Sequence, residues 1–148
     1  MKALVLAAGF ATRFYPLTEN FPKPLLKVKD KPIIEYIINS IEKLDINEIL
    51  IVTNAKFYNN FENWLNNFKC NKKIKLINDD STKNEDRLGS IGDINFVINK
   101  ENIKEDLIII SCDNLFDFNL NEIYNSFKKT KKNIIALIER DIEIAKNC

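Results

Sequence analysis

The 148-residue sequence contains no histidine. This absence excludes Ser–His and Cys–His catalytic groups, histidine general bases and histidine-ligated metals. Any chemistry must therefore be carried by carboxylates, cations, backbone amides and a metal ion that takes oxygen ligands.

Cysteine is scarce as well, and its three positions are far apart. Cys70, Cys112 and Cys148 are too few and too widely spaced for a zinc site or a disulfide framework. We expect buried or incidental thiols instead.

The sequence has neither an excess of one charge nor a long apolar run. Lys and Arg number 22 and Asp and Glu number 21, so a net charge of +1 gives no field that would attract nucleic acid. No apolar stretch approaches the ~20 residues that a membrane span needs. We expect a cytoplasmic protein of single-domain size, without nucleic-acid or membrane partners.

Apolar runs alternate with amphipathic stretches along the chain. Most of the runs are continuously apolar, which is typical of strands in a buried parallel sheet; they are residues 3–8, 49–53, 74–77, 107–112 and 134–138. Helical spacing of apolar or aromatic residues predicts core-facing helices at 32–44, 57–68 and 120–127, with Pro32 in the first turn of its helix.

This alternation predicts a doubly wound α/β sheet with right-handed crossovers. Ligands bind beyond the carboxyl ends of the strands in such sheets. Two segments lie at strand ends, the turn at Gly9 and the segment at Asp113, so both are expected on one rim. The aperiodic stretch 78–93 is a third candidate for ligand binding.

The first of these segments is suited to an anion. Short residues around Gly9 let backbone N–H groups approach a phosphate. Arg13 and Lys23 supply a cation on each side of the turn. Ala11 has less backbone freedom than glycine, so a loop that needs a positive φ there would be strained.

Four pieces then follow in order: the small-residue loop, Thr12-Arg13, Pro16-Leu17-Thr18 and Pro22-Lys23-Pro24. They resemble the N-terminal signature of the sugar-phosphate nucleotidyltransferases, the NDP-sugar pyrophosphorylases, although that family has a glycine where Ala11 stands. The resemblance implies a three-layer Rossmann-like α/β fold with a mainly parallel sheet and helices on both faces. The nucleotide-binding residues that it implies are Leu6, Ala8, Gly9, Ala11, Thr12, Arg13, Lys23 and Gly89.

The buried strand that ends at Asp113 can deliver a carboxylate oxygen to Mg²⁺. The family has Gly-Asp here, whereas this chain has Cys112 before Asp113. The alternative is that Asp113 caps the following turn, a role we assign to Asp117 for the next helix. In the third segment the family holds the nucleobase at the position of Gly89, and Ser90 is equally well placed to be an N-cap.

The implied reaction is in-line attack of a substrate phosphate on the α-phosphorus of a nucleoside triphosphate, with release of pyrophosphate. The attacking phosphate is already ionised at neutral pH, so no general base is needed, which suits a chain without histidine. Arg13 and Lys23 are the predicted catalytic cations, Mg²⁺ is the predicted cofactor, and a sugar phosphate is the second substrate.

The resemblance covers only the first part of the family's domain. We therefore expect residues 1–148 to be a single nucleotidyltransferase domain without its C-terminal acceptor-binding part, which carries a second metal-binding Asp and a Glu-Lys-Pro segment. A fragment of this kind would expose apolar surface and a sheet edge, which favours a homo-oligomer.

Three alternatives remain open on the sequence. The chain fits a cytidylyltransferase for phosphocholine or another non-sugar phosphate, which would hold a quaternary amine in an aromatic or acidic cage. It also fits a non-catalytic nucleotide-binding relative. A generic Rossmann-like protein with another ligand is the third alternative.

Overall fold

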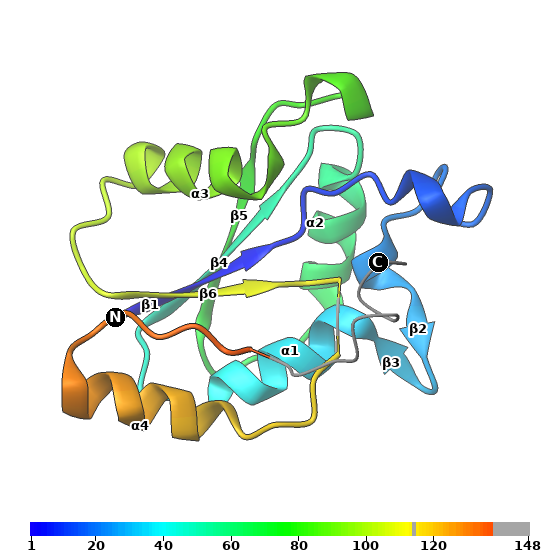
Figure 1. Cartoon of the computed structure of the whole chain (residues 1–148). Coiled ribbons are helices and arrows are strands. Elements are labelled where there is room, and N and C mark those ends of the chain that lie inside the picture. Colours follow the sequence, from blue (N-terminus) through cyan, green and yellow to red (C-terminus); the bar gives the residue numbers. More distant parts are fainter. Residues whose placement is uncertain (114, 138–148) are drawn as a thin grey trace, which may run out of the picture. The chain divides into compact units, whose positions relative to one another are not determined.

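The computed structural model describes residues 1–113 and 115–137, which divide into two compact units, one that ends at Asp117 and one that begins at Phe118 (Figure 1). The first unit is an α/β layer structure. Its elements in chain order are β1 (Lys2–Leu6), η1 (Thr12–Phe14), η2 (Lys23–Leu25), β2 (Lys27–Val28), β3 (Lys31–Pro32), α1 (Ile33–Glu42), β4 (Glu48–Thr53), α2 (Tyr58–Asn67), β5 (Lys73–Asn78), η3 (Asn84–Asp86), α3 (Gly89–Lys100) and β6 (Leu107–Ser111). The second unit contains α4 (Leu120–Thr130).

The main sheet is parallel throughout, with the strand order β5-β4-β1-β6. β1 pairs with β4 on one side and with β6 on the other, and its Leu4 lies opposite both Leu50 and Ile109. The strands β2 and β3 form a separate two-stranded antiparallel pair. The predicted mainly parallel sheet is therefore confirmed.

Burial follows the position of each strand in this sheet. All six residues of β4 are buried, because helices cover the sheet and a strand flanks β4 on each side. At the edge, β5 carries exposed lysines at positions 73 and 75. Lysines on an edge strand oppose pairing with another chain.

The helices cover both faces of the sheet. Ile33, Ile34, Ile37, Ile38 and Ile41 make the buried face of α1. On the other face, Val97 of α3 packs in one cluster with Leu4 and Val52 of the sheet. Figure 1 shows α3 and α1 on opposite sides of the strands. The predicted three-layer arrangement is confirmed.

The order of the strands also fixes the place of a ligand crevice. The chain moves from β1 to β4 and β5 in one direction, then crosses back through α3 to β6 on the other side of β1. The direction reverses between β1 and β6, and the crevice in such sheets lies outside the carboxyl ends at that reversal. Gly9 and Asp113 follow those two strands.

The prediction of a strand at 134–138 is wrong for the residues of that run that the structure describes. Residues 134–137 form no strand, with Ile135 80% and Leu137 89% exposed, and residue 138 lies outside the described residues. An apolar run has strand propensity, but a strand exists only when a neighbour completes its hydrogen-bond ladder. Nothing in the run itself specifies that neighbour.

Three predicted helix starts are also wrong. Pro32 closes β3 and precedes α1, so it is not in the first turn. Ser90 lies inside α3, which begins at Gly89. The N-cap of α4 is Asn119, whose side chain accepts a hydrogen bond from the Asn121 amide at 3.1 Å, and not Asp117. Several residues near the start of a helix can precede or cap it, and the backbone conformation determines which of them does so.

The described side chains agree with the expected inert thiols. Cys112 is buried and Cys70 is half-buried, and both are free; Cys148 lies outside the described residues. Burial raises the pKa of the Cys112 thiol well above its usual range. None of the helices in the described part of the chain is long and apolar enough to cross a membrane.

Candidate active site

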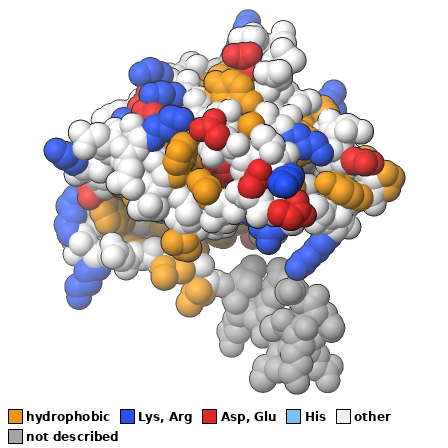
Figure 2. Space-filling view, turned by 90° about the horizontal axis from the view of Figure 1, so that it is seen from above, with side chains coloured by type: hydrophobic (Ala, Val, Ile, Leu, Met, Phe, Trp, Pro, Cys, Tyr) orange, Lys and Arg blue, Asp and Glu red, His pale blue; other side chains and the backbone are white. Residues whose placement is uncertain are grey.

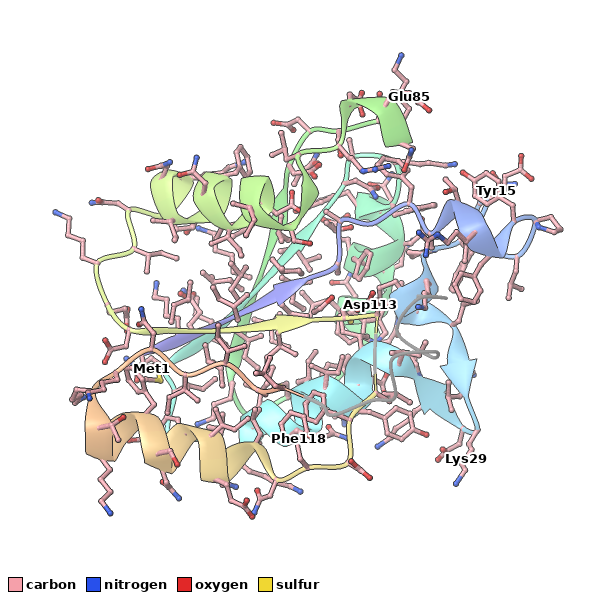
Figure 3. All side chains as sticks on the ribbon, in the orientation of Figure 1. Met1, Tyr15, Lys29, Glu85, Asp113 and Phe118 are labelled. Atoms are coloured by element: carbon pink, nitrogen blue, oxygen red, sulfur yellow. The ribbon has the colours of Figure 1, made fainter. Side chains whose placement is uncertain are left out.

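A cleft of about 400 Å³ opens at the carboxyl ends of β1 and β6, where the topology places a ligand crevice. Its walls are the chain from Leu6 through η1, the residues Lys23 and Pro24, the start of α3 with the loop before it, and the end of β6. Figure 3 shows Asp113 at the end of β6, with Tyr15 and Glu85 on loops beyond the carboxyl ends of the strands.

Every residue that the sequence predicted for the site lines this one cleft. The residues are Leu6, Ala8, Gly9, Ala11, Thr12, Arg13, Lys23, Gly89 and Asp113. They come from segments up to 107 positions apart, and the parallel sheet brings them to one rim. Their individual roles stay predictions.

A buried asparagine holds the exit of β1 in place. Asn54, which follows β4, donates a hydrogen bond from Nδ2 to the Ala8 carbonyl at 2.9 Å. Its Oδ1 accepts one from the Phe57 amide at 2.9 Å, and the residue is fully buried. The sequence analysis missed Asn54, although a polar residue directly after a continuously apolar strand was a signal for it.

The turn after Gly9 has the left-handed backbone that sequence analysis identified as costly for alanine. Ala11 has φ 48° and ψ 41°. The fully buried Thr18 donates from Oγ1 to the Ala11 carbonyl at 2.7 Å, which holds that conformation. The turn is thus fixed by the Pro-Leu-Thr segment even though it lacks a glycine.

Replacing Ala11 by glycine is expected to stabilise the protein by about 1 kcal/mol, because a left-handed conformation costs an L-residue about that much. The matched control is Ala55→Gly, at a turn position whose φ is not positive, which should destabilise the protein through the unfolded chain. Urea unfolding measures both. Equal destabilisation by the two substitutions would contradict the strain at Ala11.

Two glycines leave room for a ligand to approach the backbone. A Cβ added at Gly9 or at Gly89 would meet no protein atom within 4 Å. Gly89 also has a φ of +74°, which side chains rarely adopt, so its glycine is required by the backbone.

Three cationic side chains line the cleft. Arg13 is exposed and makes no hydrogen bond or ion pair with another described residue. The Nζ of Lys23 donates to the Asp113 carbonyl at 2.9 Å and lies 4.8 Å from the centre of the Phe14 ring. Arg87, to which the sequence gave no role, donates to the Asn84 carbonyl at 3.3 Å. The cleft is therefore suited to a polyanion.

The carboxylate of Asp113 is held by its own strand. Ser111 donates from Oγ to Asp113 Oδ1 at 2.6 Å. Among the described residues there is no group of three His, Cys, Asp or Glu that would cage a metal. One carboxylate beside a polyanion site fits Mg²⁺, which usually keeps waters and shares its ligands with substrate phosphates.

One face of the molecule carries mixed charge. The face in Figure 2 shows Lys and Arg interspersed with Asp and Glu, rather than gathered by sign.

The fold and this cleft define an α/β protein with a ligand crevice at the carboxyl ends of a parallel sheet, and comparison with known proteins gives the family. A model of the nucleotidyl transferase family matches residues 2–144. The chain belongs to the nucleotidyl transferase family.

Three relatives illustrate its range. The bifunctional protein GlmU of Methanococcus aeolicus is 42% identical over 141 residues, which is 95% of this chain and 31% of that protein. Mannose-1-phosphate guanylyltransferase 1 of Arabidopsis thaliana is 29% identical over 86% of this chain and 35% of its own length. A choline-phosphate cytidylyltransferase of Streptococcus pneumoniae is 52% identical over 52 residues, 35% of this chain and 23% of its own. The matches thus span about a quarter to a third of the length of these relatives.

Solved structures support the same fold. A Bacillus anthracis protein with a provisional assignment as a glucose-1-phosphate thymidylyltransferase has a TM-score of 0.76 at 23% identity, over 88% of this chain and 51% of its own. The CTP:phosphocholine cytidylyltransferase of Streptococcus pneumoniae has a TM-score of 0.61 at 30% identity, over 80% of this chain and 47% of its own. The predicted nucleotide-diphospho-sugar transferase fold is confirmed.

Proposed function

We propose that this chain binds a nucleoside triphosphate in the cleft and takes part in nucleotidyl transfer to a sugar 1-phosphate, giving an NDP-sugar and pyrophosphate. The observation that carries the proposal is the convergence of Gly9, Arg13, Lys23 and Asp113 on one cleft. Membership of the nucleotidyl transferase family supports the reaction type.

The residues divide the work according to their positions. Backbone groups at Gly9 and Ala11 approach the phosphates, since no Cβ obstructs Gly9. Arg13, which makes no hydrogen bond or ion pair with another described residue, binds the β- and γ-phosphates that leave as pyrophosphate. Lys23 neutralises charge at the α-phosphate, where the acceptor phosphate attacks in line.

Asp113 would hold Mg²⁺ together with the triphosphate oxygens. The ion, when bound, neutralises phosphate charge and aligns the attacked phosphorus. No side chain has to accept a proton, because the acceptor phosphate is already ionised.

The acceptor part of the proposal goes beyond this chain, which covers 31% of the GlmU relative. We infer that residues 1–148 supply the nucleotide-binding half of a nucleotidyltransferase domain. An acceptor-binding part would complete the domain, and copies of the chain would associate into a homo-oligomer. Because its substrate is a nucleoside triphosphate, we place the protein in the cytoplasm.

A second candidate is nucleotidyl transfer to phosphocholine. One specific observation favours it: the 52% identity over 52 residues to a choline-phosphate cytidylyltransferase, higher than the identity to the GlmU relative but over a shorter segment. The two candidates differ in the acceptor, and a CTP preference would favour this one.

A thermal-shift panel with each nucleoside triphosphate, in Mg²⁺ and then in EDTA, tests the nucleotide half. Saturation to about a hundred times Kd should add ~2.7 kcal/mol, or roughly 5 to 10 °C of Tm at this chain length. We expect a Mg²⁺-dependent shift with one preferred base. The matched control is Arg13→Ala, which should reduce the shift with triphosphate.

No shift with any triphosphate would contradict the proposal that these residues form a competent nucleotide half. An equal shift with and without Mg²⁺ would contradict only the proposed role of Asp113 in binding the metal, and would leave the nucleotide site in place.

A further inference from the structure

Two buried acidic residues lie beside the cleft without a role in the proposed chemistry. Asp79 follows β5, and Asp93 lies one turn into α3 and lines the cleft. Both are only 6% exposed. Aspartate is almost never buried to this extent unless it is paired, so these two groups require an account.

One oxygen of the pair is well satisfied. Asp79 Oδ1 accepts hydrogen bonds from the Ser81 amide at 2.8 Å and from the Ser81 hydroxyl at 2.7 Å. By contrast, Asp79 Oδ2 and Asp93 Oδ1 are buried and have no donor among the described residues. An ionised carboxylate is only an acceptor, so two neighbouring carboxylates cannot satisfy each other.

The two carboxyl groups interact directly. Burial first, then the charge of Asp79 and a hydrogen bond to it, raise the pKa of Asp93 from its ordinary 3.8 to about 7. One proton on the pair supplies the missing donor and removes one of two like charges. Besides the pair, the charged residues that line the cleft are Arg13, Lys23, Arg87 and Asp113. The segments around the pair also carry Glu48 in β4, Lys56 after β4, Lys73 and Lys75 in β5, Asp80 after β5, Lys83 before η3, Glu85 and Asp86 in η3, and Lys100 in α3, which donates to the Asn78 carbonyl.

We propose that Asp79 and Asp93 share one proton in mildly acidic solution and lose it as the pH rises through neutrality, and that this shared proton links the first turns of α3 to the end of β5. Those turns carry Gly89 and Ser90, which line the cleft. The proton has two effects: it positions this wall, and it keeps the cleft one charge less negative for a polyanion. The second effect rests on the proposed nucleotide function, whereas the first does not.

The free energy of unfolding should depend on pH because of this proton. Because the folded-state pKa of Asp93 lies above 3.8, the folded protein holds an extra proton between pH 3.8 and about 7. The stabilisation is complete below the unfolded pKa and is lost as pH rises through the folded pKa. We therefore expect Tm to fall as pH rises from about 5 to about 8 in the wild type.

Asp93→Asn keeps the size of the side chain, donates permanently from its amide and does not titrate. Its Tm should lose most of this pH dependence and exceed the wild-type Tm at about pH 8, which a merely structural residue would not do. Asp80→Asn is the matched control, since Asp80 is adjacent and exposed, and it should keep the wild-type slope.

The side-chain carboxyl ¹³C resonances of aspartate follow the proton directly in the unmodified protein. We expect one resonance to titrate about three pH units above an ordinary aspartate, and to vanish in Asp93→Asn. Titration of all aspartates in the ordinary range, or a parallel pH slope in wild type and Asp93→Asn, would overturn the shared proton.

Nucleotide binding separates this inference from the proposed function. Between about pH 6 and about pH 8, the Kd for Mg²⁺–nucleoside triphosphate should rise severalfold more in the wild type than in Asp93→Asn. The variant serves as the reference because titration of the ligand itself affects both proteins equally. Equal rises overturn the electrostatic part and leave the stability result to decide the positioning part. Failure to bind any triphosphate overturns the proposed function and the electrostatic part together.

Discussion

Replacing Arg13 by alanine is expected to lower the rate of pyrophosphate release by at least ~10²-fold, the scale of one lost electrostatic stabiliser. The folded protein should be unaffected, because the guanidinium is exposed and makes no hydrogen bond or ion pair with another described residue. The change therefore isolates the contact with the ligand.

The phosphate that Arg13 contacts can be identified by comparing ligands. If it binds the β- and γ-phosphates, Arg13→Ala should weaken binding of the triphosphate by ~10-fold or more and leave the monophosphate nearly unchanged. Titration calorimetry with both nucleotides measures this difference. Lys27→Ala, which removes an exposed cation outside the cleft, serves as the control. Equal weakening of mono- and triphosphate would place Arg13 elsewhere on the nucleotide.

Asp113→Asn is expected to have an effect of similar size, at least ~10²-fold on pyrophosphate release, for a different reason. The amide keeps an oxygen that can accept the Ser111 hydroxyl hydrogen bond, so the end of β6 should retain its structure. What is lost is the negative charge that attracts Mg²⁺.

The loss should depend on the metal concentration. We expect the Mg²⁺ concentration for half-maximal activity to rise in Asp113→Asn, with partial recovery at high Mg²⁺. Asp117→Asn carries the same charge change four residues further on, outside the cleft lining, and is the control. Identical Mg²⁺ dependence in wild type and Asp113→Asn would assign the carboxylate to the structure of the turn instead.

Continuous apolar runs predicted the four strands of the main sheet within one or two residues of their ends, because a strand buried on both faces tolerates few polar residues. The position of the cleft followed from topology, since parallel strands present their carboxyl ends at one rim. The pair of β2 and β3 was not predicted, because two strands of two residues leave no periodicity to detect.

Two features of the site that sequence analysis missed, Asn54 and the buried pair of Asp79 and Asp93, depend on a partner distant in the sequence. Asn54 clamps Ala8, which precedes it by 46 positions. Asp93 and Asp79 are each ordinary in sequence, and only the packing of α3 beside β5 makes them a buried pair. The sequence shows which hydrogen bonds a polar residue can donate or accept, but not which group will be its partner in the folded protein.

The hydrogen bond from Lys23 to the Asp113 carbonyl joins the loop after β1 to the end of β6, across 90 positions of the chain. In the absence of ligand this ammonium group is already engaged, so a phosphate that recruits it must either displace the carbonyl or share the three ammonium hydrogens with it. If Lys23 binds a phosphate as proposed, nucleotide affinity would therefore include the cost of this exchange of partners. A phosphate that displaced the carbonyl would also remove a contact from the end of β6, so we expect ligand binding on the two sides of the cleft to be coupled.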